Sequence, residues 1–309
     1  MTTLATPTGR FLGRWAADSP EWYEARQHRI GGSDVAAIVR LSKWQSRYAL
    51  WCEKAGLVEP DPPNSQQSRG HFLEPGVANW FAYQHPDVEV VETGTWTHVD
   101  PERDWQLANP DRLLLRDGQV VAGLEIKTDV DGRDWGKPGT DEIPLYYLTQ
   151  VRWYMDVLGL TEWRVAVLGS HLQFAEYVVY PDIDDTLYLR ATAEEFLRSI
   201  AWDEMPTVDG HEATYRTVRK LHPLINPNEK FTLPDDLAAE VLPALTEEKA
   251  AKEAAQKARA KLLAAMGNAS HAYWDEEPIA RRQAKGEGNP FLVVEKNLPT
   301  VPEPLGAAA

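Results

Sequence analysis

The chain has 309 residues, of which 43% are hydrophobic and 10% aromatic, enough for one large core and an appendage. It has a single cysteine, Cys52, which excludes an internal disulfide framework and a zinc site made of cysteines. The sequence has no run of about 18 apolar residues, and residues 1–15 lack the apolar segment of a signal peptide. We therefore expect a cytoplasmic protein without a membrane partner.

The charge of the chain is acidic and unevenly distributed. Its 32 Lys and Arg residues and 47 Asp and Glu residues give a net charge of −15. This argues against a protein that coats nucleic acid with its whole surface. Residues 10–54 differ from the rest, with eight Lys or Arg and five Asp or Glu. A locally basic segment on an acidic body predicts a confined anion site.

The first two thirds of the chain predict a mixture of helices and strands. Helices are expected at residues 21–30, 31–41, 42–60 and 72–84, with a Pro-rich loop at 60–68. Strands are expected at 88–98, 163–169 and 173–180, a β-hairpin at 111–128, and helices at 144–158 and 184–201. This order predicts an α/β or α+β fold, in which helices cover the faces of a sheet.

The composition changes at about residue 207. Residues 245–266 are rich in alanine with interleaved Glu and Lys, which predicts a helix. Such a charge pattern is typical of a solvated helix or a coiled-coil arm. Short alternating stretches at 270–274, 279–285 and 291–295 predict a small β-meander. We therefore divide the chain into a core at residues 1–207 and an appendage at 208–309.

The most informative residues lie on the expected hairpin. Asp111 follows Pro110, and Glu125 and Lys127 project from one face of the second strand because strand side chains alternate. A two-residue turn at 117–118 places Asp111 opposite Leu124, whereas a three-residue loop places it opposite Glu125. In either register the two carboxylates end close together.

Two carboxylates and a lysine on one sheet edge are suited to metal-assisted hydrolysis. Carboxylate oxygens bind Mg²⁺, which activates water and stabilises a phosphoryl transition state. A nearby lysine can orient the water or neutralise developing charge. The simpler interpretation is an exposed hairpin that carries a cross-strand ion pair.

Further polar residues are candidates for the same site or for an anion site. Glu74 is expected near a helix start, where an acid also complements the helix dipole. Gln150 and Tyr154 share one face of a helix. Ser33 and Asp34 open a helix after two glycines, a suitable phosphate cradle or a simple helix cap. Arg26 and Arg29 lie just upstream and could pair with the same phosphate.

The chain resembles the YqaJ-like viral recombinases, a family related to phage lambda exonuclease, over roughly residues 20–200. The resemblance rests on motifs in five places: Trp22, Arg26 and Ile30–Asp34; Gly70 and Glu74-Pro75; Asn109-Pro110-Asp111; Glu125-Ile126-Lys127; and Ile143-Pro144, Tyr147 and Gln150. The third and fourth match the PD-(D/E)XK nuclease core. This core implies a restriction-endonuclease-like fold with a mixed central sheet flanked by helices, here followed by a C-terminal helical and β appendage.

The resemblance implies a Mg²⁺-dependent exonuclease, with Mn²⁺ as a substitute, that digests one strand of double-stranded DNA from its 5′ end and leaves 3′ tails. The implied metal ligands are Glu74, Asp111, Glu125 and the backbone carbonyl of Ile126. Lys127 would be the catalytic lysine and Gln150 would position water or a ligand. Arg26 and Ser33 would hold the terminal 5′ phosphate. Arg112 departs from the pattern, because many relatives have glycine after the Pro-Asp pair.

The resemblance also implies the setting of the reaction. The partners are double-stranded DNA ends and a single-strand annealing protein, in the host cytoplasm if a phage encodes the chain. A homo-oligomeric ring, for example a trimer, would enclose DNA in a basic channel despite the acidic net charge.

Two other functions fit the same fold. One is a structure-specific endonuclease or a Cas4-like protein, although the single cysteine disfavours a Cas4-type iron–sulfur cluster. The other is a catalytically inactive DNA-binding or assembly module, which the intact set of Asp111, Glu125 and Lys127 disfavours.

Overall fold

The computed structural model describes residues 4–16, 19–62 and 64–301, and Pro63 in the expected loop at 60–68 lies outside them. The chain divides into two compact units, Met1–Ile225 and Asn226–Ala309. Within the described ranges, no helix is both long and apolar enough to cross a lipid bilayer.

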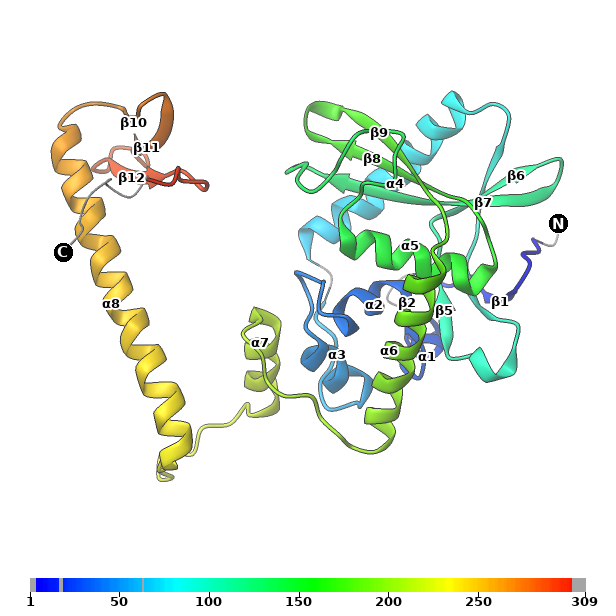
Figure 1. The fold of residues 1–309 in the computed structure, drawn as a ribbon, viewed down its shortest axis with the longest axis horizontal. Coiled ribbons are helices and arrows are strands. Elements are labelled where there is room, and N and C mark those ends of the chain that lie inside the picture. The colour runs from blue at the N-terminus through cyan, green and yellow to red at the C-terminus, as the bar shows by residue number, and fades with distance from the viewer. Residues whose placement is uncertain (1–3, 17–18, 63, 302–309) are drawn as a thin grey trace, which may run out of the picture. The chain divides into compact units, whose positions relative to one another are not determined.

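The first unit is built around a five-stranded sheet with the order β3-β6-β7-β8-β9 (Figure 1). Its strands are β3 (Glu89–Glu92), β6 (Arg112–Arg116), β7 (Gln119–Asp129), β8 (Trp163–Gly169) and β9 (Phe174–Val179). Neighbouring strands are antiparallel except β7 and β8, which are parallel. The expectation of a mixed central sheet flanked by helices is therefore confirmed.

Helices cover both faces of this sheet. Helix α4 (Ser65–Gln84) packs Phe81 against Leu124 and Ile126 of β7 on one face. Helix α5 (Leu145–Leu158) makes the crossover between the parallel strands β7 and β8 and lies on the other face. Because side chains alternate along β7, Glu125 and Lys127 point toward α5 and not toward α4.

A second, four-stranded sheet has the order β1-β4-β5-β2. Its strands are β1 (Gly9–Gly13), β4 (Thr95–His98), β5 (Gln106–Ala108) and β2 (Ile30–Gly31). Of these strands, only β4 is predicted from the sequence, which also predicts a first helix over residues 21–30. The predicted end of this helix is wrong, because Ile30 and Gly31 pair in parallel with β5. So short a strand has no periodicity of its own, and only the pairing defines it.

The remaining helices of this unit are α1 (Pro20–Gln27), α2 (Gly32–Ile38), α3 (Arg47–Lys54), α6 (Ile183–Ala201) and α7 (Glu212–Leu221), with short 3-10 turns η1 (Pro101–Arg103) and η2 (Ser170–Leu172). Helix α3 is shorter than the expected range of 42–60 because Ser46 caps it, accepting the Ala49 N–H at 3.0 Å. Helix α4 begins inside the expected Pro-rich loop, because Asn64 and Gln67 form a capping box.

Helix α7 was not predicted, and it packs on α3 within the first unit. The Thr214 hydroxyl donates to Ser46 Oγ at 2.7 Å, and Lys220 forms an ion pair with Asp61 at 2.7 Å. The division between the units therefore lies after Ile225, later in the chain than residue 207.

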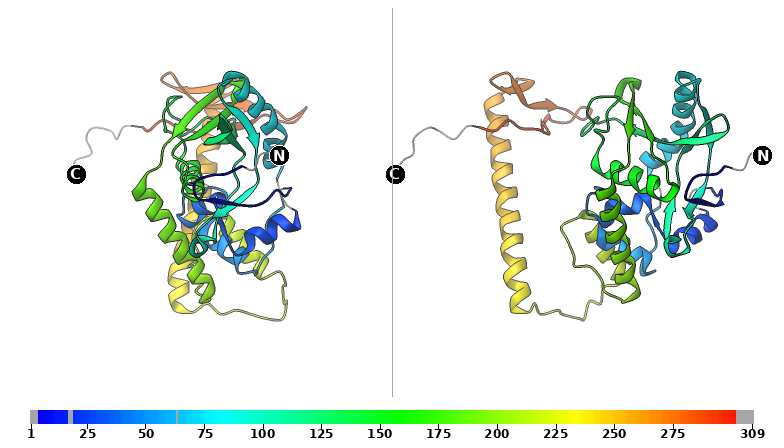
Figure 2. Two further views of the ribbon diagram at one scale, coloured as in Figure 1. Left: turned by 90° about the vertical axis from the view of Figure 1, so that its right-hand side faces the viewer. Right: turned by 45° about the vertical axis from the view of Figure 1, so that its right-hand side comes forward.

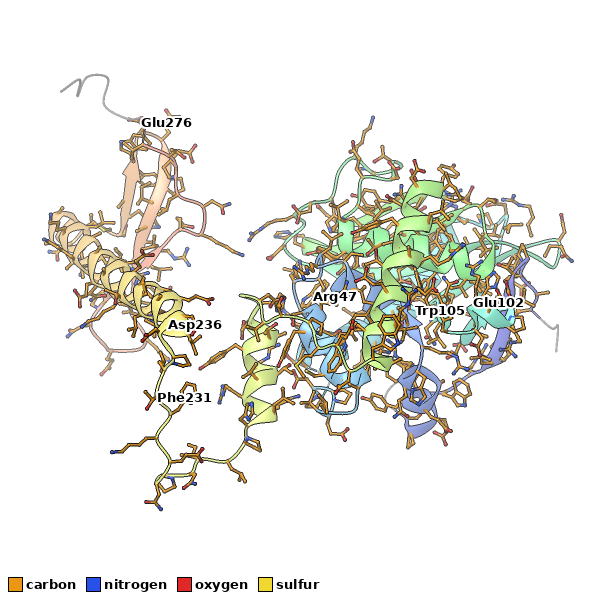
Figure 3. The ribbon with its side chains drawn as sticks, turned by 60° about the horizontal axis from the view of Figure 1, so that its bottom comes forward. Arg47, Glu102, Trp105, Phe231, Asp236 and Glu276 are labelled. Carbon is orange, nitrogen blue, oxygen red and sulfur yellow. The ribbon has the colours of Figure 1, made fainter. Side chains whose placement is uncertain are left out.

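The second unit contains the long helix α8 (Asp235–Met266) and an antiparallel sheet of β10 (His271–Trp274), β11 (Glu277–Gln283) and β12 (Phe291–Val294) (Figure 2). The expected meander is therefore present, and the helix starts earlier than the predicted residue 245. None of the α8 residues is buried, and side chains such as that of Asp236 point outward (Figure 3).

We predict that a chain ending at Ile225 folds cooperatively with a melting temperature close to that of the intact protein. A chain ending at Pro206 should melt several degrees lower, because it loses α7 and exposes the surface of α3 around Ser46. Thermal unfolding followed by circular dichroism compares the two. Equal melting temperatures would show that α7 contributes nothing to the core.

Candidate active site

The β6–β7 hairpin has a bulge that brings its carboxylates together. Near the two-residue turn, Arg116 pairs with Gln119 and Leu115 with Val120, but Leu114 pairs with Ala122. Beyond this bulge Arg112 lies opposite Leu124, a register that continues to Asp111 beside Glu125. The turn thus has two residues. Asp111 nevertheless lies opposite Glu125, which is the pairing expected for a three-residue loop.

Asp111, Glu125 and Lys127 converge on the α5 side of the sheet. Asp111 Oδ2 accepts the backbone N–H of Ile126 at 2.6 Å. Lys127 Nζ lies 2.5 Å from Glu125 Oε1. Gln150 on α5 donates from Nε2 to the same Oε1 at 2.7 Å, and its Oε1 lies 3.3 Å from Lys127 Nζ. The structure therefore gathers the four residues that were expected to act in catalysis.

Burial makes this site electrostatically demanding. Burial, followed by the charge of Glu125, raises the pKa of Asp111 well above its usual value. Burial also raises the pKa of Glu125, although Lys127 opposes the shift. Burial alone would lower the pKa of Lys127, but the charges of Glu125 and Asp111 raise it. Lys127 is therefore an ammonium ion at neutral pH.

A divalent cation suits the donor set around Glu125. Its Oε2 is buried and has no hydrogen-bond partner among the described residues. Asp111 lies next to it, and each carboxylate raises the free energy of ionising the other. A cation between them would satisfy the orphaned oxygen and offset this repulsion.

Glu74, the third expected carboxylate ligand, is already paired. Its Oε1 accepts Arg112 Nη1 at 2.6 Å. The described ranges contain no cluster of three or more acidic, His or Cys side chains spaced for a metal ion. Ile126, the expected backbone ligand, donates its N–H to Asp111, which places its backbone beside the carboxylates.

Arg26 and Ser33, the expected phosphate ligands, also lie together. Arg26 Nη2 donates to Ser33 Oγ at 3.1 Å and to Asp34 Oδ1 at 3.0 Å, and its guanidinium lies 4.4 Å from the Trp22 ring centroid. A Cβ on Gly31 would lie 3.0 Å from Arg26 Nη1, so a larger residue there would push the guanidinium back by a few tenths of an ångström. The bare backbone at residue 31 lets the guanidinium approach the start of α2.

Two neighbours complete this cluster in ways that the sequence did not indicate. Asp34 is buried, accepts the Gly31 N–H at 2.9 Å and forms an ion pair with Lys54 at 3.0 Å. Lys54 also donates to the backbone oxygens of Arg26 and Arg29. The Arg29 side chain itself points elsewhere, to the backbone oxygen of Asp104 at 2.9 Å. Arg29 therefore does not join Arg26 in this cluster, contrary to the expectation that both could pair with the same phosphate.

Tyr154 connects the two groups of residues. A Cβ on Gly32 would collide with its ring, so α2 packs directly on it. The Tyr154 hydroxyl accepts Gln150 Nε2 at 3.1 Å. Burial, followed by the charge of Glu125, raises the pKa of Tyr154 well above its usual value, so the phenol stays neutral.

A row of aromatic side chains extends from Lys127 to Trp44. This row was not predicted from the sequence. Lys127 Nζ lies 4.6 Å from the Tyr147 ring centroid, and the Tyr147 ring contacts Tyr146, which contacts Trp44. Lys43 Nζ donates to the Tyr146 hydroxyl at 2.9 Å. Trp44 is 49% exposed. The sequence did not indicate its place beside the site, because Trp44 was counted among the apolar residues of the expected helix at 42–60.

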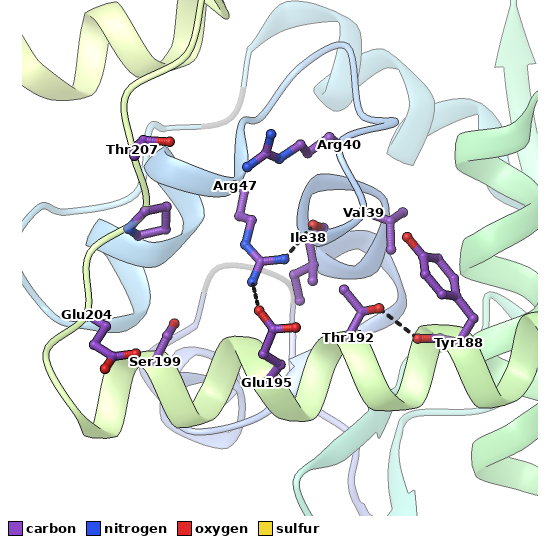
Figure 4. A pocket seen from close by; sticks show the side chains of 11 residues that line it. Ile38, Val39, Arg40, Arg47, Tyr188, Thr192, Glu195, Ser199, Glu204 and Thr207 are labelled. Carbon is purple, nitrogen blue, oxygen red and sulfur yellow. Dashed lines mark hydrogen bonds and ion pairs between the residues drawn. The ribbon is translucent and has the colours of Figure 1, made fainter.

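A pocket of about 440 Å³ lies elsewhere, between the ends of α2 and α3 and helix α6 (Figure 4). Arg47 crosses it, forming an ion pair with Glu195 at 3.3 Å and donating to the Ile38 backbone oxygen. None of the expected catalytic, metal or phosphate residues lines this pocket.

The comparison with protein families agrees with these motifs. Residues 21–162 match the YqaJ-like viral recombinase domain. The resemblance seen in the sequence is therefore confirmed. A relative, the uncharacterized protein YqaJ of Bacillus subtilis (strain 168), is 28% identical over 221 residues, which cover 69% of this chain and 66% of the relative. The chain thus spans just under two thirds of that relative.

The solved structures that match this chain include those of two exonucleases. An alkaline exonuclease (LHK-Exo) from Laribacter hongkongensis is 21% identical, with a TM-score of 0.48 over 66% of this chain and 100% of that one. A phage-related exonuclease from Haemophilus somnus 129PT is 10% identical, with a TM-score of 0.41 over 57% of this chain and 96% of that one.

We predict that Asp34→Asn destabilises the protein by about 3 kcal/mol, because it leaves two buried cations uncompensated. Arg26 and Lys54 lower the pKa of Asp34 although burial opposes them. The carboxylate therefore stabilises the fold at pH values above its unfolded pKa of about 3.9, and this contribution is lost as the pH falls below that value. Urea unfolding of the wild type and of Asp34→Asn at pH 7 and at pH 3.5 measures how far the stability difference between the two proteins shrinks at the lower pH.

The control is Asp87→Asn, which removes the exposed ion pair with Arg116. It should change stability little at pH 7. If both variants lose the same stability, the Asp34 cluster is no more than a surface ion pair.

Proposed function

We propose that this chain is a Mg²⁺-dependent exonuclease that digests one strand of duplex DNA from its 5′ end and leaves 3′ tails for recombination. The observation that carries the proposal is the convergence of Asp111, Glu125 and Lys127 within reach of Gln150. The matched viral recombinase domain supports it. Exonuclease activity is what the names of the Laribacter and Haemophilus proteins state of them, and we extend it to this chain.

The carboxylates would hold the metal ion. Asp111 and Glu125 would bind it, and Glu74 and the Ile126 carbonyl would complete the set. A bound Mg²⁺, or Mn²⁺ in its place, supplies Lewis-acid chemistry that activates water and stabilises the phosphoryl charge.

Lys127 and Gln150 would prepare the same place for hydrolysis. The Lys127 ammonium can donate to the attacking water or to an oxygen of the scissile phosphate, where negative charge develops. Gln150 fixes the orientation of the Glu125 carboxylate through its amide N–H. Their positions on a strand and a facing helix make the arrangement rigid.

Arg26 and Ser33 would bind the 5′-terminal phosphate. A guanidinium and a hydroxyl 3.1 Å apart can donate together to a phosphate dianion. Tyr154 joins this place to Gln150, so an anchored 5′ end would lie next to the carboxylates. Under this proposal, the anchored 5′ phosphate would direct hydrolysis to one strand from its phosphorylated end.

The proposal extends to assembly. An outer surface with a net charge of −15 opposes DNA binding, whereas a homo-oligomeric ring, for example a trimer, could line a channel with the basic residues of segment 10–54. The second unit, with its exposed helix α8, would be available to a single-strand annealing protein.

We predict that Lys127→Ala and Asp111→Ala each reduce cleavage by more than tenfold while the fold is retained. Loss of a metal ligand or of the ammonium should cost several kcal/mol of transition-state stabilisation. The assay is release of label from linear duplex DNA with Mg²⁺, with EDTA and with Ca²⁺. Wild-type activity in excess EDTA, or a variant within tenfold of wild type, would contradict the proposal. Equal cutting of circular duplex would instead favour a structure-specific endonuclease.

We predict that Arg26→Ala lowers the preference for 5′-phosphate over 5′-hydroxyl ends by about tenfold or more, since one charged hydrogen bond contributes roughly 1.5–3 kcal/mol. The measurement is the ratio of digestion rates on the two kinds of end. Arg29→Ala is the control, because that side chain points to Asp104. A preference that survives Arg26→Ala, or that falls equally in the control, would exclude Arg26 as the phosphate ligand.

A further inference from the structure

Arg112 links Glu74 on α4 to the backbone of Asp111. Its Nη1 donates to Glu74 Oε1 at 2.6 Å and to the backbone oxygen of Asp111 at 2.6 Å. The side chain is only 12% exposed and that of Glu74 24%, so water screens the pair weakly. Both hydrogens of one amino group are thus used to bridge α4 and the start of β6.

The charges at the site come close to balance without a metal ion. Glu74 pairs with Arg112 and Glu125 pairs with Lys127, and the charge of Glu74 acts on both Asp111 and Glu125. Fully ionised, this set carries one net negative charge. A divalent cation added to it would leave one excess positive charge in a buried site, which is unfavourable. If the guanidinium moved away, the charges would balance.

We propose that Arg112 is a displaceable counter-ion, which holds Glu74 in the metal-free protein and must release it before Glu74 can bind the metal. This inference rests on the proposed function, in which Glu74 is a metal ligand. It makes Arg112 a positioning residue that sets metal affinity. The alternative is that the ion pair only ties α4 to β6 and has no part in metal binding.

The two interpretations differ in how metal binding and the ion pair are linked. A displaceable guanidinium competes with the cation, so its removal should tighten metal binding. A purely structural ion pair would stabilise the metal-free and metal-bound protein equally, and its removal would leave the affinity unchanged. Metal affinity therefore separates them without any measurement of nuclease activity.

The experiment is titration of the full chain with Mn²⁺, in which electron paramagnetic resonance reports the free ion. We expect Arg112→Ala and Arg112→Gln to bind Mn²⁺ about fivefold more tightly than wild type, the equilibrium equivalent of one ion pair of modest strength. The glutamine keeps a donor for the Asp111 backbone oxygen, in case the alanine variant is unstable. Arg116→Ala is the matched control, because Arg116 lies on the same strand as Arg112 and forms an exposed ion pair with Asp87. This substitution should not alter the Mn²⁺ affinity.

Unfolding provides a second readout. The melting temperature of Arg112→Gln should fall below that of wild type without metal, and the difference should disappear at saturating Mn²⁺. Unchanged or weaker Mn²⁺ binding in both Arg112 variants would overturn the proposal.

Glu74→Gln distinguishes this failure from failure of the proposed function. If that variant binds Mn²⁺ like wild type, Glu74 is not a ligand, and both the ligand set and the counter-ion proposal are wrong. If it binds Mn²⁺ more weakly but Arg112→Gln does not bind more tightly, the counter-ion proposal alone is wrong.

Discussion

The burial of the Glu125 carboxylate is the constraint on which the rest of the site depends. A carboxylate that is 2% exposed is stable only if cations and donors surround it. Lys127 on the same strand and Gln150 on α5 both contact its Oε1, while its Oε2 has no partner among the described residues. The protein therefore carries an incompletely satisfied charge at the centre of its sheet, which a structural role alone does not explain.

The second buried charge, Asp34, shows the opposite arrangement. Arg26, Lys54 and the Gly31 N–H satisfy it completely, and it holds the beginning of α2 against β2. Glycines at 31 and 32 allow the guanidinium and the Tyr154 ring to approach the backbone. One carboxylate is thus fully paired and supports the fold, whereas the other has an oxygen without a partner among the described residues. Tyr154 lies between them, packing on Gly32 and accepting a hydrogen bond from Gln150.

Much of the fold, and the grouping of Asp111, Glu125 and Lys127, could be predicted because local signals agreed. The hairpin turn, the alternation along β7 and the helical spacing from Tyr147 to Gln150 together placed Asp111, Glu125 and Lys127. Lys54, β2 and α7 were missed because long-range contacts define them: a buried ion pair, a two-residue pairing with β5 and packing on α3. The ion pair of Arg112 with Glu74 likewise joins distant segments, so no local pattern indicates it.

The bulge in the hairpin has a consequence for how such a site could evolve. Between the turn and the bulge the strands pair in one register, and beyond it they pair in the next. If the register of the turn continued without the bulge, Leu124 instead of Glu125 would lie opposite Asp111. The outer end of the hairpin can therefore vary in sequence with little effect on Asp111, Glu125 and Lys127. Loss of the unpaired residue Val121 would remove the bulge and still leave Glu125 beside Asp111, whereas a regular ladder that kept all the residues would place an apolar side chain there.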